Sequence, residues 1–143
     1  MSVAEESWAE RRRRAVQAHA AEHARRRHAE AEQARALLAR FVRDATAAGL
    51  PAQRLRARAA GGRTTYRTRL HGWYLRPDRS VAVGTDGEFY VLVVPASLRA
   101  RLFGASVPPE APRLILGEGG RDGESIPLEA VLRRRLTAGP DGP

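Results

Sequence analysis

Arginine is the residue type in this chain with the clearest chemical potential. Residues 45 to 77 contain seven arginines and neither Asp nor Glu. A guanidinium is planar, always charged and able to form paired hydrogen bonds with phosphate or carboxylate. The candidate polyanion-binding residues are Arg54, Arg56, Arg58, Arg63, Arg67 and Arg69. Because the aromatic residues are few and most of them are expected in the core, this set favours contact with backbone phosphates over base stacking.

The positive charge also has a simpler explanation. The formal net charge is +9, and all 25 basic residues are Arg, with no Lys and no Asn in the chain. This composition is typical of a GC-rich genome, so the charge can reflect codon usage. Outward Arg on an edge strand can also serve only to prevent edge pairing. From the sequence, a partner such as nucleic acid or a ribonucleoprotein remains one of two open interpretations.

A glycine-rich segment, residues 117 to 125, is a second candidate site. It lies between an expected strand and an expected helix, where backbone amides can bind phosphate. The candidate residues are Gly119, Gly120, Arg121, Asp122 and Glu124. Their spacing matches neither a dinucleotide-binding nor a Walker motif, and the carboxylates would repel phosphate. We therefore expect a structural connection, with binding of a cationic partner as the alternative.

Residues that could support catalysis are few. His19, Glu22 and His23 have the H-x-x-E-H spacing of some zinc hydrolases, but they lie on an expected projecting helix that offers no third ligand and no pocket. The chain has no Cys, which excludes disulfides and thiolate metal sites. His71 is expected at a strand end and the nearby carboxylates in turns. The sequence thus favours binding over catalysis and predicts neither a metal nor a cofactor.

The N-terminal third of the chain is expected to form one long helix. Residues 3 to 48 are rich in Ala, Arg, Glu, Gln and Leu and contain neither Gly nor Pro. Residues 1 to 33 are expected to project, and their alternative role is pairing with a second copy or another helix. The domain, residues 34 to 137, should begin with an apolar stripe at helical spacing. That stripe comprises Ala34, Leu37, Leu38, Phe41, Val42 and Ala45.

The residues after the helix predict an antiparallel sheet of about four or five strands. Gly49 and Pro51 should end the helix, and residues 53 to 62 should form a basic connection. Strands are expected at residues 65 to 70, 73 to 76, 81 to 85 and 88 to 94. Asp86 and Gly87 predict a type I′ hairpin. The apolar segment Phe89 to Val94 is expected at the centre of the sheet.

The C-terminal part of the chain completes an α+β fold. A short strand is expected at residues 113 to 117, a helix at 127 to 136 and a flexible tail at 138 to 143. Residues 97 to 103 fit either a helix or a strand. The fold class is therefore α+β, with a long N-terminal helix, an antiparallel sheet and a short C-terminal helix.

Two segments carry a resemblance to known sequences. They are HGWYLRPDRSVAVGTDGEFYVL, from His71 to Leu92, and GGRDGES, from Gly119 to Ser125. Together they resemble a group of small basic proteins from GC-rich actinobacteria. The resemblance covers most of the chain after Leu37 and implies a single domain. The group has no assigned activity, so the resemblance implies no catalytic residue.

The sequence also predicts where the protein resides. Glu5, Glu6 and Glu10 precede the first Arg run, and no apolar signal-peptide core follows them. The longest apolar run, Phe89 to Val94, is too short to cross a bilayer. We expect a cytoplasmic protein.

Overall fold

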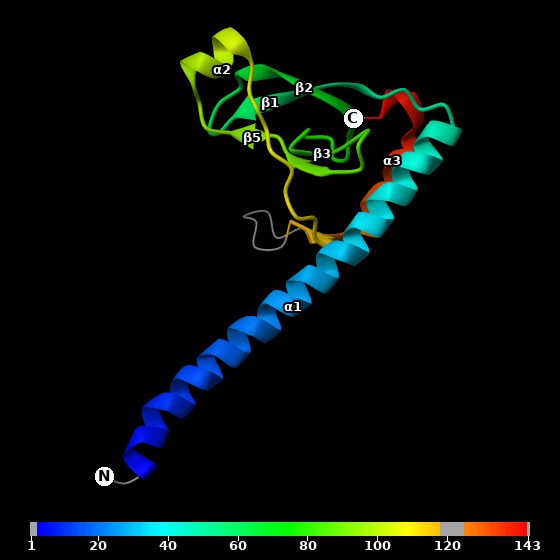
Figure 1. The fold of residues 1–143 in the computed structure, drawn as a ribbon. Coiled ribbons are helices and arrows are strands. Elements are labelled where there is room, and N and C mark those ends of the chain that lie inside the picture. The colour runs from blue at the N-terminus through cyan, green and yellow to red at the C-terminus, as the bar shows by residue number, and fades with distance from the viewer. Residues whose placement is uncertain (1–2, 118–124, 143) are drawn as a thin grey trace.

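The fold was examined in a computed structural model, which describes residues 3–117 and 125–142. It contains a long helix, a five-stranded sheet, a two-stranded ribbon and two shorter helices (Figure 1). The elements are α1 (Val3–Ala47), β1 (Gln53–Ala59), β2 (Thr65–Tyr74), β3 (Val81–Gly84), β4 (Phe89–Val91), β5 (Val93–Val94), α2 (Leu98–Phe103), β6 (Ile115–Leu116), β7 (Ile126–Pro127), α3 (Leu128–Ala138) and the 3-10 turn η1 (Gly139–Asp141). The α+β class expected from the sequence is confirmed.

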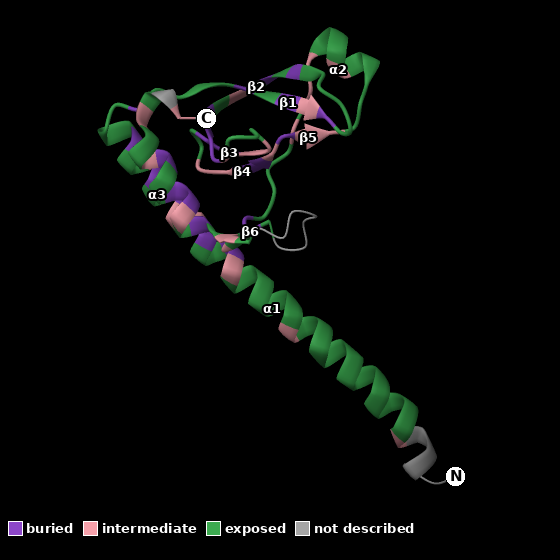
Figure 2. Cartoon of the chain, turned by 180° about the vertical axis from the view of Figure 1, so that it is seen from behind, coloured by how far each residue is buried: buried purple, intermediate pink, exposed green. Residues whose placement is uncertain are grey.

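Helix α1 is unbroken over 45 residues, which corresponds to a length of about 68 Å at 1.5 Å per residue. Its N-terminal half runs away from the rest of the molecule (Figure 1), and residues 8 to 29 are exposed apart from the half-buried Glu22 (Figure 2). Packing begins at Glu30, whose Oε1 accepts a hydrogen bond from the Leu114 amide at 3.0 Å. Ala31 is the first buried residue of the described helix. The exposed half therefore extends to about residue 29.

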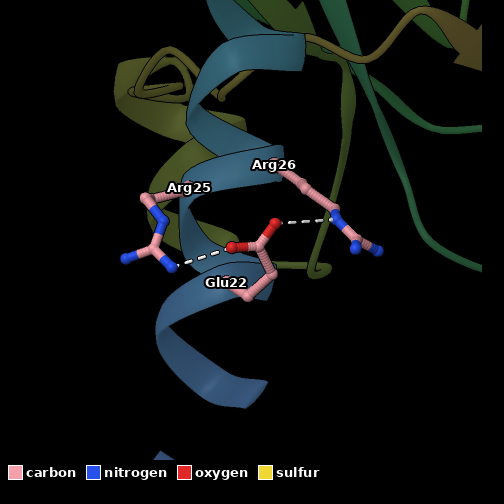
Figure 3. A network of polar contacts seen from close by, with 3 residues as sticks. All are labelled: Glu22, Arg25 and Arg26. Carbon is pink, nitrogen blue, oxygen red and sulfur yellow. Dashed lines mark hydrogen bonds and ion pairs between the residues drawn. The ribbon is translucent and has the colours of Figure 1, made fainter. Parts of the chain in front are cut away.

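Local contacts support the exposed half of α1. Glu22 accepts a bond from Arg25 Nη2 at 2.8 Å and, through its other oxygen, from Arg26 Nε at 3.3 Å (Figure 3). The pairing of Glu22 with Arg26 is one that the helical spacing predicts. Exposed pairs of this kind contribute about 0.3 to 0.5 kcal/mol each to helix stability. They connect α1 only to itself, so the domain does not depend on them.

Deleting residues 1 to 27 should leave a folded domain. The truncated chain keeps Glu30 and every buried residue of α1. We expect a cooperative thermal transition whose midpoint moves by less than about 5 °C, because the lost contacts amount to less than about 1 kcal/mol. Circular dichroism melting measures this. A broad, non-cooperative melt of the truncated protein would contradict the assignment of its core.

Helix α1 ends as the sequence predicts. Gly49 adopts a positive φ of 73°. The Leu50 amide donates to the Ala45 carbonyl at 2.9 Å and the Gly49 amide to Thr46 at 3.1 Å, which is the Schellman pattern. Leu50 is buried, and its carbonyl accepts from Trp73 Nε1 at 3.3 Å. This end therefore fixes the direction in which the chain enters the sheet.

Residues 53 to 62 form a strand and a turn, so the expected basic connection is wrong. Strand β1 covers Gln53–Ala59 and lies inside the sheet, whose order is β4-β3-β2-β1-β5. Leu55, Ala57 and Ala59 are buried while the arginines between them point outward. The period of two is present in the sequence, but two of the three inward residues are Ala. Their small apolar area makes the alternation easy to miss.

The segment 88 to 94 does not lie at the centre of the sheet, which is a second correction. Strand β4 pairs with β3 at one edge, and β5 pairs in parallel with β1 at the other. Leu92 joins the two strands, and its carbonyl accepts from the Arg58 amide at 2.7 Å. The sheet therefore curls until both of its edges meet on one segment. This closure introduces the single parallel pair into an otherwise antiparallel sheet.

The two faces of the sheet bury separate cores, which explains why residues 89 to 94 are apolar on both sides. Trp73 and Phe89 face α1 and α3, whereas the adjacent Tyr74 and Tyr90 face the inside of the curled sheet. The Phe41 ring of α1 meets Trp73 edge to face, with centroids 5.8 Å apart. The apolar segment 89 to 94 is therefore buried on both faces, although its strands β4 and β5 lie at the edges of the sheet.

The turn between β3 and β4 is a three-residue loop, which differs from the expected type I′ turn. The Gly87 amide donates to Gly84 at 2.9 Å, and the Gly84 amide donates to Glu88 at 2.9 Å. Gly87 has a φ of 80°, and among described non-glycine residues only Arg79 has a positive φ. This is a type I turn followed by a left-handed glycine. Asp86 stabilises the turn by accepting a bond from the Tyr90 hydroxyl at 2.6 Å, and burial together with this bond raises the pKa of Tyr90 to about 12.

The C-terminal elements pack against α1. Strand β6 pairs with β7 in a separate ribbon, so the strand expected near residues 113 to 117 is present but outside the main sheet. The expected C-terminal helix is α3, which lies along the end of α1 (Figure 1). Arg135 on α3 is buried and donates from Nε to the Tyr74 carbonyl at 3.0 Å. No helix in residues 3–117 and 125–142 has the length and apolar character to cross a membrane.

Candidate polyanion-binding site

The paired strands β1 and β2 place arginines on one outward face. Arg56 lies directly opposite Arg67, and Arg58 lies opposite Thr65. Directly opposed residues of an antiparallel pair point to the same side of the sheet. The inward positions between them carry Ala57 and Tyr66, which are buried. Period-two alternation in both strands therefore gathers the guanidiniums on the solvent side.

A β-bulge between Arg54 and Arg56 changes the direction of this face. At the bulge, the Arg56 amide donates to the Tyr74 hydroxyl at 2.8 Å. The Leu55 carbonyl accepts from the Thr68 hydroxyl at 2.6 Å. Side chains thus satisfy two backbone groups that a regular ladder would pair. A bulge bends the strand and redirects its side chains. The side chains of Arg54 and Arg56 therefore take different directions, although both belong to β1.

Replacing Tyr74 with Phe tests this construction. The change keeps the buried ring but leaves the Arg56 amide without its partner. We expect the free energy of unfolding to fall by about 1 to 3 kcal/mol, which is the usual cost of an unpaired buried polar group. Chemical denaturation measures the difference. A loss below about 0.5 kcal/mol would show that the bulge does not depend on this hydroxyl.

The segment that contains α2 is attached to β2 by polar contacts. The Ala105 amide donates to the Arg67 carbonyl at 2.7 Å, and the Ser97 amide donates to the Tyr66 hydroxyl at 3.1 Å. Gly104 has a φ of 86°, and a Cβ at this position would lie 2.9 Å from the Arg67 carbonyl oxygen. Glycine therefore permits the close approach of α2 to the sheet.

A groove of about 530 Å³ lies between β1, β2 and the α2 segment. Its arginines come from three elements, because Arg54 belongs to β1, Arg67 and Arg69 to β2, and Arg99 to α2. The remaining lining residues are Thr68, Leu70, Phe103, Gly104, Ala105, Ser106 and Val107. Among the residues that the structure describes, none that lines this groove carries a carboxylate. We call this surface the arginine groove.

The charge in the arginine groove is not balanced by ion pairs. Within the described part of the chain, the ion pairs lie on α1 and α3 and include none of the four groove arginines. Arg67 makes one long contact, from Nη2 to the Leu102 carbonyl at 3.5 Å. Residues 95 to 109 contain no Asp or Glu, as is also true of residues 45 to 77. The groove therefore presents a concentrated positive field.

The candidate arginines divide between the groove and its surroundings. Arg54, Arg67 and Arg69 line it. Arg56 shares the outward face but donates from Nε to Thr65 Oγ1 at 3.1 Å. Arg63 is exposed in the turn after β1 and does not line the groove.

Arg58 has a different environment from the other arginines of β1. It is half-buried and lies near Asp78. Burial raises the pKa of Asp78, but hydrogen bonds from the Ser80 hydroxyl and amide oppose this effect. The charges of Arg76 and Arg58 add to them, so the net pKa of Asp78 is lowered. Part of the Arg58 charge is thus offset within the protein.

Arg99 and Phe103 are groove residues that sequence reasoning missed. Both belong to α2, a segment whose secondary structure the sequence left ambiguous. Most of the aromatic residues are expected in the core, yet the Phe103 side chain is 80% exposed. The absence of acidic residues from 95 to 109 is the one sequence signal that links this segment to the basic strands.

The other sites suggested by the sequence are the glycine-rich segment, a metal site and His71. Gly119, Gly120, Arg121, Asp122 and Glu124 lie outside the described residues. The described residues contain no group of His, Asp and Glu arranged to hold a metal ion. His71 lies inside β2 and is exposed, so its expected position at a strand end is wrong.

The carboxylates near the hairpins organise turns. Asp78 Oδ1 accepts from the Ser80 amide at 3.0 Å and from its hydroxyl at 2.6 Å. Asp86 Oδ1 accepts from the Glu88 amide at 2.9 Å. These are the local contacts that favour Asp in turns.

The fold and the arginine groove define a small α+β protein with a basic surface groove beside a curled sheet. Comparisons with protein-family models, with curated proteins and with solved structures find no match to this chain.

Proposed function

We propose that this protein acts by binding and not by catalysis, and that its arginine groove contacts a polyanion. Nucleic acid, free or within a ribonucleoprotein, is the partner whose chemistry fits best. The observation that carries the proposal is the convergence of Arg54, Arg67, Arg69 and Arg99 on one groove whose lining holds no carboxylate. Phosphate oxygens are the natural acceptors for such a set of guanidiniums.

Local charge supports this proposal better than net charge does. Codon usage can raise the arginine content of a whole chain, but it does not explain why carboxylates are absent from both walls of one groove. On α1, by contrast, acidic residues lie among the arginines, and Arg25, Arg26 and Arg35 form exposed ion pairs with glutamates. Acidic residues thus offset part of the charge of α1, whereas none of the described residues that line the groove is acidic. That difference indicates a ligand of opposite charge.

A salt titration tests the proposal. The probe is a fluorescently labelled RNA hairpin that offers both a duplex and a loop, and anisotropy reports its binding. We expect tight binding at low salt, with the logarithm of affinity falling by about 0.9 units per phosphate contact for each tenfold rise in salt. Absence of binding at low salt would overturn the proposal, and codon usage would then suffice to explain the arginines.

The exposed half of α1 favours a second candidate function, which is pairing with another helix. Trp8 is 67% exposed and Val16 is 64% exposed on this half. The remainder of its surface is Ala and charged residues, which offer little area for a stable coiled coil. Sedimentation of the intact and truncated chains distinguishes the two functions. An oligomer that is lost on deleting residues 1 to 27 would favour the helix-pairing role.

A further inference from the structure

Helix α2 exposes three large apolar side chains, which the phosphate contacts alone do not explain. Leu98 is 77% exposed, Leu102 is 67% exposed and Phe103 is 80% exposed. No residue of α2 is buried. A cluster of exposed apolar side chains on a small protein commonly marks a binding surface. These residues therefore call for a ligand with apolar surface of its own.

The apolar side chains of α2 are not what holds it in place. Its segment is attached through the Ser97 amide to Tyr66 and through the Ala105 amide to the Arg67 carbonyl. The Ser97 hydroxyl accepts from the Ala100 amide at 3.2 Å and caps the helix. Because polar contacts hold α2, Phe103 is free to serve another purpose.

The position of Phe103 indicates which class of ligand fits the groove. Its ring lines the same groove as the four arginines. A ligand that fills this groove must present negative charge to the guanidiniums and a flat apolar face to the ring. A nucleotide combines both, since its phosphate is anionic and its base stacks on aromatic rings. The groove volume of about 530 Å³ lies within the range of about 300 to 1,000 Å³ that is usual for ligand sites.

We propose that the arginine groove binds single-stranded nucleic acid, with an unpaired base stacked on Phe103 and the flanking phosphates on Arg67, Arg69 and Arg99. This inference rests on the proposed function and narrows it. Bases inside a duplex are stacked on one another and present only their edges, whereas an unpaired base can expose its face to a protein ring. The exposed ring on a basic wall thus favours a single strand over a duplex.

Binding of two RNA probes to three proteins tests the inference. The probes are a labelled oligouridylate and an RNA duplex of the same length, and the proteins are the wild type, Phe103→Ala and Phe103→Trp. Loss of one stacked base costs about 1 to 3 kcal/mol, which corresponds to a weakening of about 5- to 150-fold. We expect this loss when Phe103→Ala binds the oligouridylate, whereas its affinity for the duplex should change by less than about 2-fold. Phe103→Trp should bind the oligouridylate with an affinity close to that of the wild type, because Trp also stacks on bases.

A matched control is Leu98→Ala, which removes another exposed apolar side chain of α2 that does not line the groove. It should leave oligouridylate affinity within about 2-fold of the wild type. Equal losses for Leu98→Ala and Phe103→Ala would overturn the stacking role, because they would indicate a general effect on α2. Thermal melting of each variant confirms that the protein is folded.

The outcomes separate this inference from the proposed function. If Phe103→Ala leaves both affinities unchanged while the RNA probes still bind with a steep salt dependence, the stacking inference is wrong and polyanion binding stands. If neither RNA binds at low salt, both are wrong. Binding of polyglutamate with no binding of either RNA would overturn the stacking inference and the nucleic-acid partner, and it would assign the groove to an acidic protein.

Discussion

Replacing Phe41 with Ala should lower the free energy of unfolding by about 3 to 5 kcal/mol. Phe41 is 2% exposed and packs edge to face against Trp73, where α1 meets the sheet. Truncation removes buried apolar area and leaves a cavity that the surrounding Leu38 and Ala45 cannot fill. A domain of this size has a total stability of about 5 to 15 kcal/mol, so the loss is a large part of the whole.

Chemical denaturation of Phe41→Ala measures this loss, and Trp8→Ala is its matched control. Trp8 is also an aromatic residue of α1, but it lies on the exposed half. Its replacement should change stability by less than about 0.5 kcal/mol. Equal effects of the two substitutions would contradict the division of α1 into a docked and an exposed half.

Replacing Arg67 and Arg69 with Gln should weaken RNA binding by roughly 50-fold at about 0.1 M salt. Each arginine is expected to contact one phosphate, and each lost contact should flatten the salt dependence by about one unit. Gln keeps a polar side chain, although a shorter one, while removing the charge. The affinity difference should shrink as salt rises, because counterion release supplies most of the binding energy.

The matched control for this double variant is Arg43→Gln with Arg133→Gln. It removes the same number of charges from exposed positions on α1 and α3, which lie across the molecule from α2 (Figure 1). We expect less than about a 3-fold change in affinity and an unchanged salt slope. Equal weakening by both double variants would indicate that net charge, and not the groove, governs binding.

Helical parts of this fold could be predicted because their signals are local. The absence of Gly and Pro from residues 3 to 48 predicts α1, and Gly49 followed by Pro51 predicts its end. The stripe that includes Leu38 and Phe41 predicts which half docks, and these residues are buried. Each signal lies within a few residues of the structure that it determines.

The sheet could be predicted only in part because its pairing is long-range. Closure depends on Arg58 pairing with Val93, and β4 and β5 lie at opposite edges although one residue separates them in the chain. An apolar segment buried on two faces has the same sequence pattern at the centre of an open sheet as at the edge of a curled one. Strand β1 was missed because Ala supplies most of its inward face.

The groove, too, could be predicted only in part, because some of its residues come together through a long-range contact. Arg67 and Arg69 were predicted on an outward strand face, and Arg54 was predicted in the basic connection that precedes it; all three line the groove. Arg99 and Phe103 join them only because the Ala105 amide bonds to the Arg67 carbonyl and brings α2 to the sheet. No local pattern predicts that contact. The aromatic half of the site therefore became visible only in the folded protein.

The most direct measurement of the central claim is a nuclear magnetic resonance titration of the isotope-labelled protein with oligouridylate at low salt. Backbone amide shifts identify which residues meet the ligand. We predict that the largest changes will fall on residues 67 to 70 and 99 to 107, with small changes on α1 and α3. Shifts confined to α1, or spread evenly over all exposed arginines, would contradict a binding site in the arginine groove.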